Sequence, residues 1–329
     1  MLDSYGQVVN PESFIVRATE LSDFAQCRRK WFFQSHNGLN LEPKRKSMKL
    51  VFGIAWHSAL ETYYNTGSEA HAQRVLALKM AEETMKVLDV VSPEYHVDIE
   101  QEADEMIELG KQMLSGYTVW SNTQASPKDT DLKIIDTELR LLVPFHDDAY
   151  LATRLDAVAV GGTHNLWVFE HKTVSKSTSV DYAPMLQLDF QMGLQLLALT
   201  FLKNTDKYAG YSITGSIYNL ARKQAPSSRV KSPLFGRHPV FRTRNALTEV
   251  AKTLSYISHE MRMAKDDPRK LYHNPHPYAG ICSWGCAFKD VCEAMCNGED
   301  YEYILQENFQ KREKDIMQTL EEEMGEDGS

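Results

Sequence analysis

Three residues on two neighbouring segments have the types and the spacing for metal-assisted hydrolysis. Asp156 is separated by thirteen residues from the run Glu170-His171-Lys172, and the turn-forming sequence GGTHN lies between them. Alternate residues of a strand face the same side, so Glu170 and Lys172 are predicted to project together. An antiparallel hairpin centred on the turn pairs residues whose numbers sum to about 326, which places Asp156 opposite Glu170.

Facing carboxylates repel each other unless a cation lies between them, and hard divalent cations prefer such oxygen ligands. Lys172, predicted to lie opposite Arg154, is placed to orient or deprotonate a water molecule or to stabilise charge on a phosphate. The alternative is an exposed sheet face on which these charges are only solvated. The apolar segment 166–169 before Glu170 favours the metal site.

Three further polar residues are weaker candidates. His57 lies in the apolar segment FGIAWHSALE, Gln191 lies in LDFQMGLQLLAL, and Glu138 lies on the predicted strand before Asp156. Each has an ordinary structural interpretation: a packed core histidine, a polar position on a helix, and a surface carboxylate. Spacing alone selects none of the three.

Four cysteines, Cys282, Cys286, Cys292 and Cys296, lie within fifteen residues, and Cys27 lies 255 residues upstream. Clustered thiolates of this kind are typical ligands of zinc or of an iron–sulfur cluster. The four downstream cysteines can close a site alone, or Cys27 can join three of them. His273 and His276 are close enough in sequence to serve a zinc site, and incidental free cysteines are the remaining interpretation.

The segments that carry these residues change character near residue 130. Helices are predicted after the N-cap candidates Ser22 and Ser47 and at residues 69–90, 93–120, 185–202 and 247–265. Strands, which share a partial two-residue alternation, are predicted at residues 133–143, 150–160, 166–173 and 208–220. Residues 121–131 and 222–240 are predicted as loops. Strands around a helix, flanked by further helices, predict an α/β fold with a mixed sheet.

The ordered motifs resemble one known family. They are LSDFAQCRRKWFF, FGIAWHSALE, RLDAV, FEHKT, LDFQMGLQLLAL and ICSWGCAFKDVC. Together they resemble the RecB-like branch of the PD-(D/E)XK nuclease superfamily, especially phage-encoded and CRISPR-associated single-strand exonucleases that carry an iron–sulfur cluster. Two departures are Gln195, where an aromatic residue is common, and Thr153, where the family often has glycine.

The resemblance implies a role for each matched position. His57, Asp156, Glu170 and the backbone carbonyl of His171 would bind Mg²⁺ or Mn²⁺, Lys172 would help activate water, and Gln191 would position the water or the DNA. Cys27, Cys282, Cys286 and Cys292 would ligate a [4Fe-4S] cluster, which leaves Cys296 surplus. The implied fold is a restriction-endonuclease-like core with a helical N-terminal region and a C-terminal Cys-rich iron–sulfur region. The expected division is 1–130 helical, 131–270 nuclease core, 271–297 cluster region and 298–329 acidic tail.

The expected activity is therefore metal-dependent hydrolysis of DNA, preferably single-stranded, in phage or prokaryotic recombination, repair or replication, with recombination or replication proteins as partners. The alternatives are a non-catalytic DNA-binding or assembly subunit, and a nuclease with structural zinc in place of the cluster. The segment MLDSYGQVVN resembles no secretory signal, and no apolar run is long enough to span a membrane, so a cytoplasmic location in a bacterium or phage-infected host is expected.

The formal net charge of −9 at first argues against a nucleic-acid substrate. Residues 299–329 carry −8 and residues 81–110 carry −9, so the rest of the chain carries +8. Residues 28–49 and 222–244 are both strongly basic. Either solvated loops or DNA-binding surfaces explain them. The DNA-binding candidates are Arg28, Arg29, Lys30, Arg154, Arg222, Lys223, Arg229 and Lys231.

Overall fold

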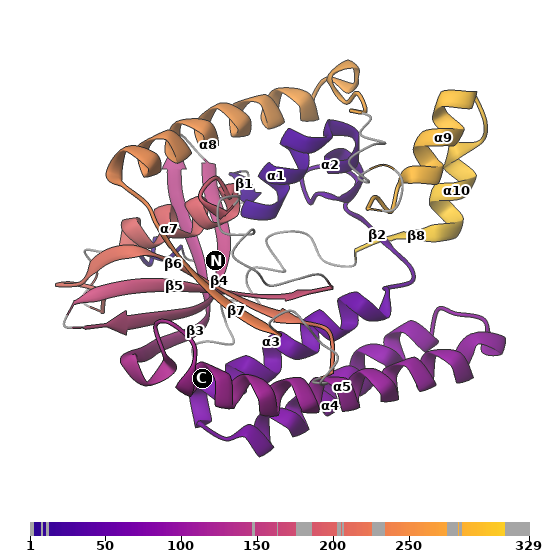
Figure 1. Cartoon of the computed structure of the whole chain (residues 1–329). Coiled ribbons are helices and arrows are strands. Elements are labelled where there is room, and N and C mark those ends of the chain that lie inside the picture. Colours follow the sequence, from indigo (N-terminus) through magenta and orange to yellow (C-terminus); the bar gives the residue numbers. More distant parts are fainter. Residues whose placement is uncertain are drawn as a thin grey trace. The chain divides into compact units, whose positions relative to one another are not determined.

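The computed structural model describes residues 3–7, 9–10, 13–146, 149–162, 164–175, 186–202, 205, 207–225, 234–274, 282 and 285–312. The chain forms two compact units (Figure 1). The first consists of Met1–Lys44, Arg140–Thr153 and Thr248–Ser329, and the second of Arg45–Leu139 and Arg154–Leu247. Strands β3 (Leu132–His146) and β4 (Ala149–Gly161) and helix α8 (Arg244–Lys265) each have residues in both units. The four-part division expected from the sequence stays a prediction.

The second unit contains a mixed sheet. The second half of β4 pairs antiparallel with β5 (Asn165–Val174), β5 pairs parallel with β6 (Ser212–Arg222), and β6 pairs antiparallel with β7 (Phe235–Phe241). The β4–β5 register includes Ala157 opposite Phe169, so the predicted hairpin and its register are confirmed. The α/β prediction of a mixed sheet flanked by helices is confirmed as well.

Three helices of the second unit form an apolar core against part of this sheet. They are α3 (Met48–Thr66), α4 (Glu69–Leu88) and α5 (His96–Thr123), the last preceded by the short 3-10 helix Pro93–Tyr95. Their buried residues pack with Ala221 of β6 and Phe235 of β7. Ser47 caps α3 as predicted, since its side chain accepts a hydrogen bond from the Leu50 amide.

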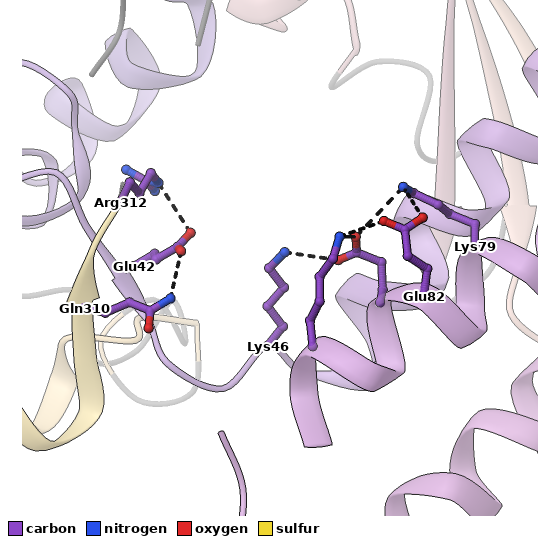
Figure 2. A network of polar contacts seen from close by, with 8 residues as sticks. Glu42, Lys46, Lys79, Glu82, Gln310 and Arg312 are labelled. Carbon is purple, nitrogen blue, oxygen red and sulfur yellow. Dashed lines mark hydrogen bonds and ion pairs between the residues drawn. The ribbon is translucent and has the colours of Figure 1, made fainter. Parts of the chain in front are cut away.

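An ion pair links the segment just before α3 to α4, where Lys46 pairs with the buried Glu83 (Figure 2). Within α4, Lys79 pairs with Glu82. Helix α7 (Phe190–Leu202) packs on β5 and β6 and is buried along most of its length. It covers much of the predicted helix 185–202, whose first residue lies outside the described ones.

The first unit holds two helices near the N-terminus and two near the cysteines. The former are α1 (Ala18–Gln26) and α2 (Arg28–Gln34), and the latter are α9 (Lys289–Asn297) and α10 (Tyr301–Asn308). Strand β1 (Phe14–Arg17) runs parallel to the first residues of β4. Phe33, Phe288, Val291 and Phe309 form a small core beside α9.

A second ladder in this unit pairs β2 (Leu41–Pro43) with β8 (Phe309–Lys311). Glu42 accepts from Gln310 at 3.1 Å and lies 3.5 Å from Arg312 (Figure 2). Short 3-10 helices occupy Asp129–Asp131 and Pro268–Lys270.

Two sequence predictions are wrong. Ser22 is not an N-cap, because α1 already begins at Ala18 and ends before Cys27, whose extended backbone separates α1 from α2. The segment 222–240 is not only a loop, because it contains most of β7. Pro239 hid that strand, since proline is tolerated mainly where a strand lies at the edge of a sheet. Among the described residues, none of the helices has the length and apolar character needed to cross a membrane.

Candidate functional site

Asp156 is held from two sides in the candidate site. It is buried on β4, its Oδ2 accepts the backbone N–H of His171 at 2.6 Å, and its Oδ1 lies 3.3 Å from His57 Nδ1. Burial alone would raise the pKa of Asp156, but His57 and the hydrogen bonds outweigh burial and lower it to about 2. Asp156 is therefore ionised at neutral pH.

Glu138, which the sequence offered only as a weaker candidate, lies beside His57 and Asp156. One ligand atom each from His57, Glu138 and Asp156 lie within 4.8 Å of one another. Glu138 comes from β3, where its positive φ of 47° is unusual for a residue other than glycine. It is buried, so its interpretation as a surface carboxylate is wrong. Only the three-dimensional pairing of β3 with β4 could reveal it.

The environment of Glu138 disfavours its charge. Burial raises its pKa to about 7, and the lowering by Arg154, whose Nε lies 2.9 Å from the carboxylate, is partly opposed by Asp156. A divalent cation near the triad would reverse this preference, because it would stabilise the ionised form.

Glu170 lies outside the triad, and both of its carboxylate oxygens have donors. Lys172 Nζ and Gln191 Nε2 contact Oε1 at 2.5 and 3.2 Å, and Gln195 Nε2 donates to Oε2 at 3.0 Å. Burial and the nearby Asp156 raise the pKa of Glu170. Gln195 also donates to the Arg154 carbonyl at 3.1 Å. Gln195 therefore links the Glu170 carboxylate of β5 to the backbone of β4.

Lys172 remains a cation in this arrangement. Burial lowers its pKa, but the ion pair with Glu170 outweighs burial and the pKa is raised overall. His171, between the two, is buried, and burial lowers its pKa to about 3. The site thus combines a permanent cation with a neutral imidazole.

The donor set suits a hard divalent cation. The triad offers two carboxylates and one imidazole, ligand types that Mg²⁺ and Mn²⁺ accept. The pKa of His57 is raised, since Asp156 and its other acidic neighbours outweigh burial. A cation bound here would displace the proton that these acids favour on His57.

Four of the five cysteines interact electrostatically in the first unit. Burial raises the pKa of Cys286, and Cys27 and Cys282 raise it further. Burial likewise raises the pKa of Cys292, against the lowering effect of Arg29, and Cys27 and Cys286 act on it too. Cys296 is exposed on α9. The grouping includes Cys27, which lies at the break between α1 and α2.

Most of the basic candidates that the structure describes have partners within the chain. Arg28 pairs with Glu260 at 2.5 Å, Lys30 pairs with Asp23 at 2.6 Å, and Arg29 lies beside Cys292. Arg154 pairs with Glu138, as described above. Arg222 and Lys223 are half-buried at the end of β6, and Arg229 and Lys231 lie outside the described residues.

The sequence profile of the PD-(D/E)XK nuclease superfamily matches residues 17–293. A solved structure titled "Crystal structure of SSO0001" is similar at 13% sequence identity and a TM-score of 0.36, covering 87% of this chain and 89% of that chain. No curated protein matches the sequence.

Proposed function

Since the chain belongs to the PD-(D/E)XK nuclease superfamily, we propose that it is a metal-dependent DNA exonuclease that prefers single strands. The observation that carries this proposal is the group of half-buried His57 with buried Glu138 and Asp156, beside the Glu170–Lys172 ion pair. A non-catalytic member of the superfamily would not need to keep three acids, an imidazole and a lysine together. Recombination, repair or replication of DNA is the setting that fits such an activity.

The chain's residues divide the chemistry between them. A divalent cation, when bound, would polarise the scissile phosphate and lower the pKa of a water molecule. His57, Asp156, Glu138 and Glu170, with the His171 carbonyl, are the groups proposed to hold it. Lys172 Nζ, kept protonated by Glu170, donates to a phosphate oxygen or to the attacking water. Gln191 and Gln195 hold the Glu170 carboxylate in place.

The first experiment tests the nuclease. Purified protein with Mn²⁺ is incubated with linear single-stranded DNA labelled at either end, and with circular single-stranded DNA. The wild type should shorten the linear strand and leave the circle intact. Asp156→Asn and Lys172→Met should each lose activity by about 10²–10⁴-fold. Lys252→Met is the matched control, because Lys252 is an exposed lysine that pairs with Glu249 at the surface.

Two results would reject the proposal. Undiminished activity in both site variants would assign the cleavage to a contaminant. Tight binding of single-stranded DNA without cleavage in Mn²⁺ would support the alternative of a non-catalytic binding subunit. Cleavage of the circular DNA would show that the enzyme is an endonuclease and not an exonuclease.

We also propose that Cys27, Cys282, Cys286 and Cys292 hold a [4Fe-4S] cluster. These thiols influence one another's pKa values, which supports a single site that they share. Soft thiolates suit iron–sulfur clusters and zinc alike. Protein purified without oxygen should be brown and absorb broadly near ~400 nm. A colourless protein with one equivalent of zinc would establish the alternative.

A pair of serine variants separates the ligands from the surplus thiol. Cys27→Ser should lose iron and lower the melting temperature, because it removes a ligand that joins the α1–α2 segment to α9. Cys296→Ser should keep the iron content and the melting temperature of the wild type. Loss of iron in Cys296→Ser with full iron content in Cys27→Ser would instead favour a site closed by the four downstream cysteines.

A further inference from the structure

A row of three polar residues crosses the sheet behind the candidate site. The register places His171 of β5 beside Asn219 of β6, and Asn219 beside Arg237 of β7. All three residues are buried. Burying a guanidinium is costly unless it is paired and hydrogen-bonded, so this row needs a physical explanation.

Arg237 has a partner for each of its nitrogens. Its Nε donates to Asn219 Oδ1 at 2.6 Å, one terminal nitrogen donates to the Pro127 carbonyl at 2.7 Å, and the other lies 2.8 Å from Asp129 Oδ1. The guanidinium carbon also lies 5.3 Å from the centre of the Phe169 ring. These contacts from several directions fix the orientation of the guanidinium.

The direction of the hydrogen bonds follows from chemistry. A guanidinium only donates, so the oxygen of the Asn219 amide faces Arg237 and its nitrogen faces His171. Asn219 Nδ2 lies 3.3 Å from His171 Nδ1. An amide nitrogen only donates as well, so Nδ1 accepts, and the hydrogen of the neutral imidazole sits on Nε2. The Tyr64 ring stacks on the same imidazole, with 5.5 Å between the two ring centroids.

The main chain of His171 belongs to the site itself. Its N–H donates to Asp156 Oδ2 at 2.6 Å, and Glu170 and Lys172 are its neighbours in sequence. The opposite tautomer would point an N–H of the ring at the Asn219 amide group. Two donors would then face each other, and the ring and its backbone would have to move.

We propose that Arg237 is a positioning residue of the active site: through the Asn219 amide it fixes the tautomer and orientation of His171, and so the main chain that orients Asp156. The proposal rests on the proposed function only in taking Asp156 and its neighbours as metal ligands. Its tests read the imidazole and the bound metal and do not depend on cleavage.

The decisive variant is Asn219→Asp, which keeps the shape of the side chain but removes its donor. The new carboxylate still accepts from Arg237, but it can only accept from His171, so Nδ1 should become protonated. Nitrogen NMR of metal-free protein labelled with ¹⁵N-histidine reports which ring nitrogen carries hydrogen, with His171→Gln assigning the signal. Titration with Mn²⁺ should show affinity about 10-fold weaker than in the wild type.

Tyr117→Phe is the matched control. The Tyr117 hydroxyl lies 3.3 Å from a terminal nitrogen of Arg237 and 2.6 Å from the Tyr64 hydroxyl. Its loss should lower the melting temperature, yet the His171 tautomer and the Mn²⁺ affinity should match the wild type. Arg237→Lys provides a second test, because it keeps the charge but removes the Nε donor, and a mixture of tautomers should result.

Three outcomes would overturn the proposal. They are a hydrogen on Nδ1 in the wild type, unchanged Mn²⁺ affinity in Asn219→Asp, and an equal loss of affinity in Tyr117→Phe. Should Asn219→Asp fail to fold, a single wild-type tautomer in Arg237→Lys would overturn it. A wild type that shows the expected tautomer and metal response but cleaves no DNA would reject the proposed function and leave this inference standing.

Discussion

The Glu170 carboxylate is held by more donors than a simple metal ligand needs. Gln195 Nε2 is the donor to its Oε2, while Lys172 and Gln191 share Oε1. These hydrogen bonds favour the ionised acid, whose pKa is otherwise raised by burial and by Asp156. Gln195 therefore helps decide at which pH the site is ready to bind metal.

Gln195→Leu should raise the pKa of Glu170 further, since it removes a donor to the charged form. The acid limb of the pH profile of kcat/KM should move to higher pH, and activity near neutral pH should fall several-fold. Gln187→Leu replaces an exposed glutamine ahead of the same helix and should leave the profile unchanged. Overlapping profiles of Gln195→Leu and wild type would show that Gln195 only fills space.

Glu138→Gln should change how stability depends on pH. The pKa of Glu138 is raised to about 7, so the folded protein keeps a proton that the unfolded chain releases near 4.5. The contribution to stability is complete below the unfolded value and is lost as the pH rises through about 7. Without metal, the melting temperature of the variant should fall less over this window than that of the wild type.

The same variant tests the metal. At about pH 8, Mn²⁺ should raise the melting temperature of the wild type more than that of Glu138→Gln, because binding favours the ionised acid. Differential scanning fluorimetry in EDTA and in Mn²⁺ measures both effects. Parallel melting curves for the two proteins would remove Glu138 from the metal site.

At the scale of helices and strands, the sequence predicts the features that depend on residues close together along the chain. The β4–β5 hairpin follows from the GGTHN turn and two apolar strands, and its register follows from symmetry about the turn. Ser47 marks the start of α3 for a similarly local reason. Strand β7 does not follow, because its pairing with β6 depends on a distant partner and Pro239 contradicts the pattern. Arg237 was therefore read as part of a basic loop.

The buried carboxylate of Glu83 on α4 is contacted by two lysines, one on the same helix and one just before α3. Lys86 and Lys46 contact it at 2.6 and 3.1 Å, and they lower its pKa although burial acts to raise it. Glu83→Gln should lower the free energy of unfolding by about 1 kcal/mol at neutral pH. A lowered pKa stabilises the fold above the unfolded value of 4.5, so the difference from wild type should shrink as the pH falls below it.

Urea denaturation of both proteins at several pH values measures this difference. Glu82→Gln is the control on the same helix, since Glu82 is exposed and pairs with Lys79 and Lys86 at the surface. A difference between Glu83→Gln and wild type that stays constant down to about pH 3 would show that the ionised carboxylate contributes nothing.

At the scale of the whole molecule, the sequence predicts the family but not the residues that surround the candidate site. His57 and Asp156 lie together, as the motifs implied, whereas Glu138, Asn219 and Arg237 come from separate strands without a shared motif. Strand pairing and burial bring these residues together in space, and neither can be read from the order of residues along the chain. The motif order, by contrast, extends along the chain and is easily read.

The net charge of −9 conceals a basic region at the end of β6. Arg222 and Lys223 lie there, and burial with the nearby Lys49 lowers the pKa of Lys223. The double variant Arg222→Gln/Lys223→Gln should weaken binding of single-stranded DNA and reduce the slope of log affinity against log salt by about 1.4. Fluorescence anisotropy in EDTA, which prevents cleavage, measures the slope.

Lys252→Gln/Lys289→Gln removes the same number of charges from two ion-paired lysines and serves as the control. Its salt slope should equal that of the wild type. Equal slopes for all three proteins would mean that DNA does not contact the end of β6.

The way the chain divides between its two units has a consequence for genetics. The path passes from one unit to the other after Lys44, Leu139, Thr153 and Leu247. Neither unit corresponds to an uninterrupted stretch of coding sequence. A nonsense mutation before codon 247, or a deletion of either half of the gene, therefore removes parts of both units. Function can be dissected in this protein by single codon changes, and not by cloning its halves.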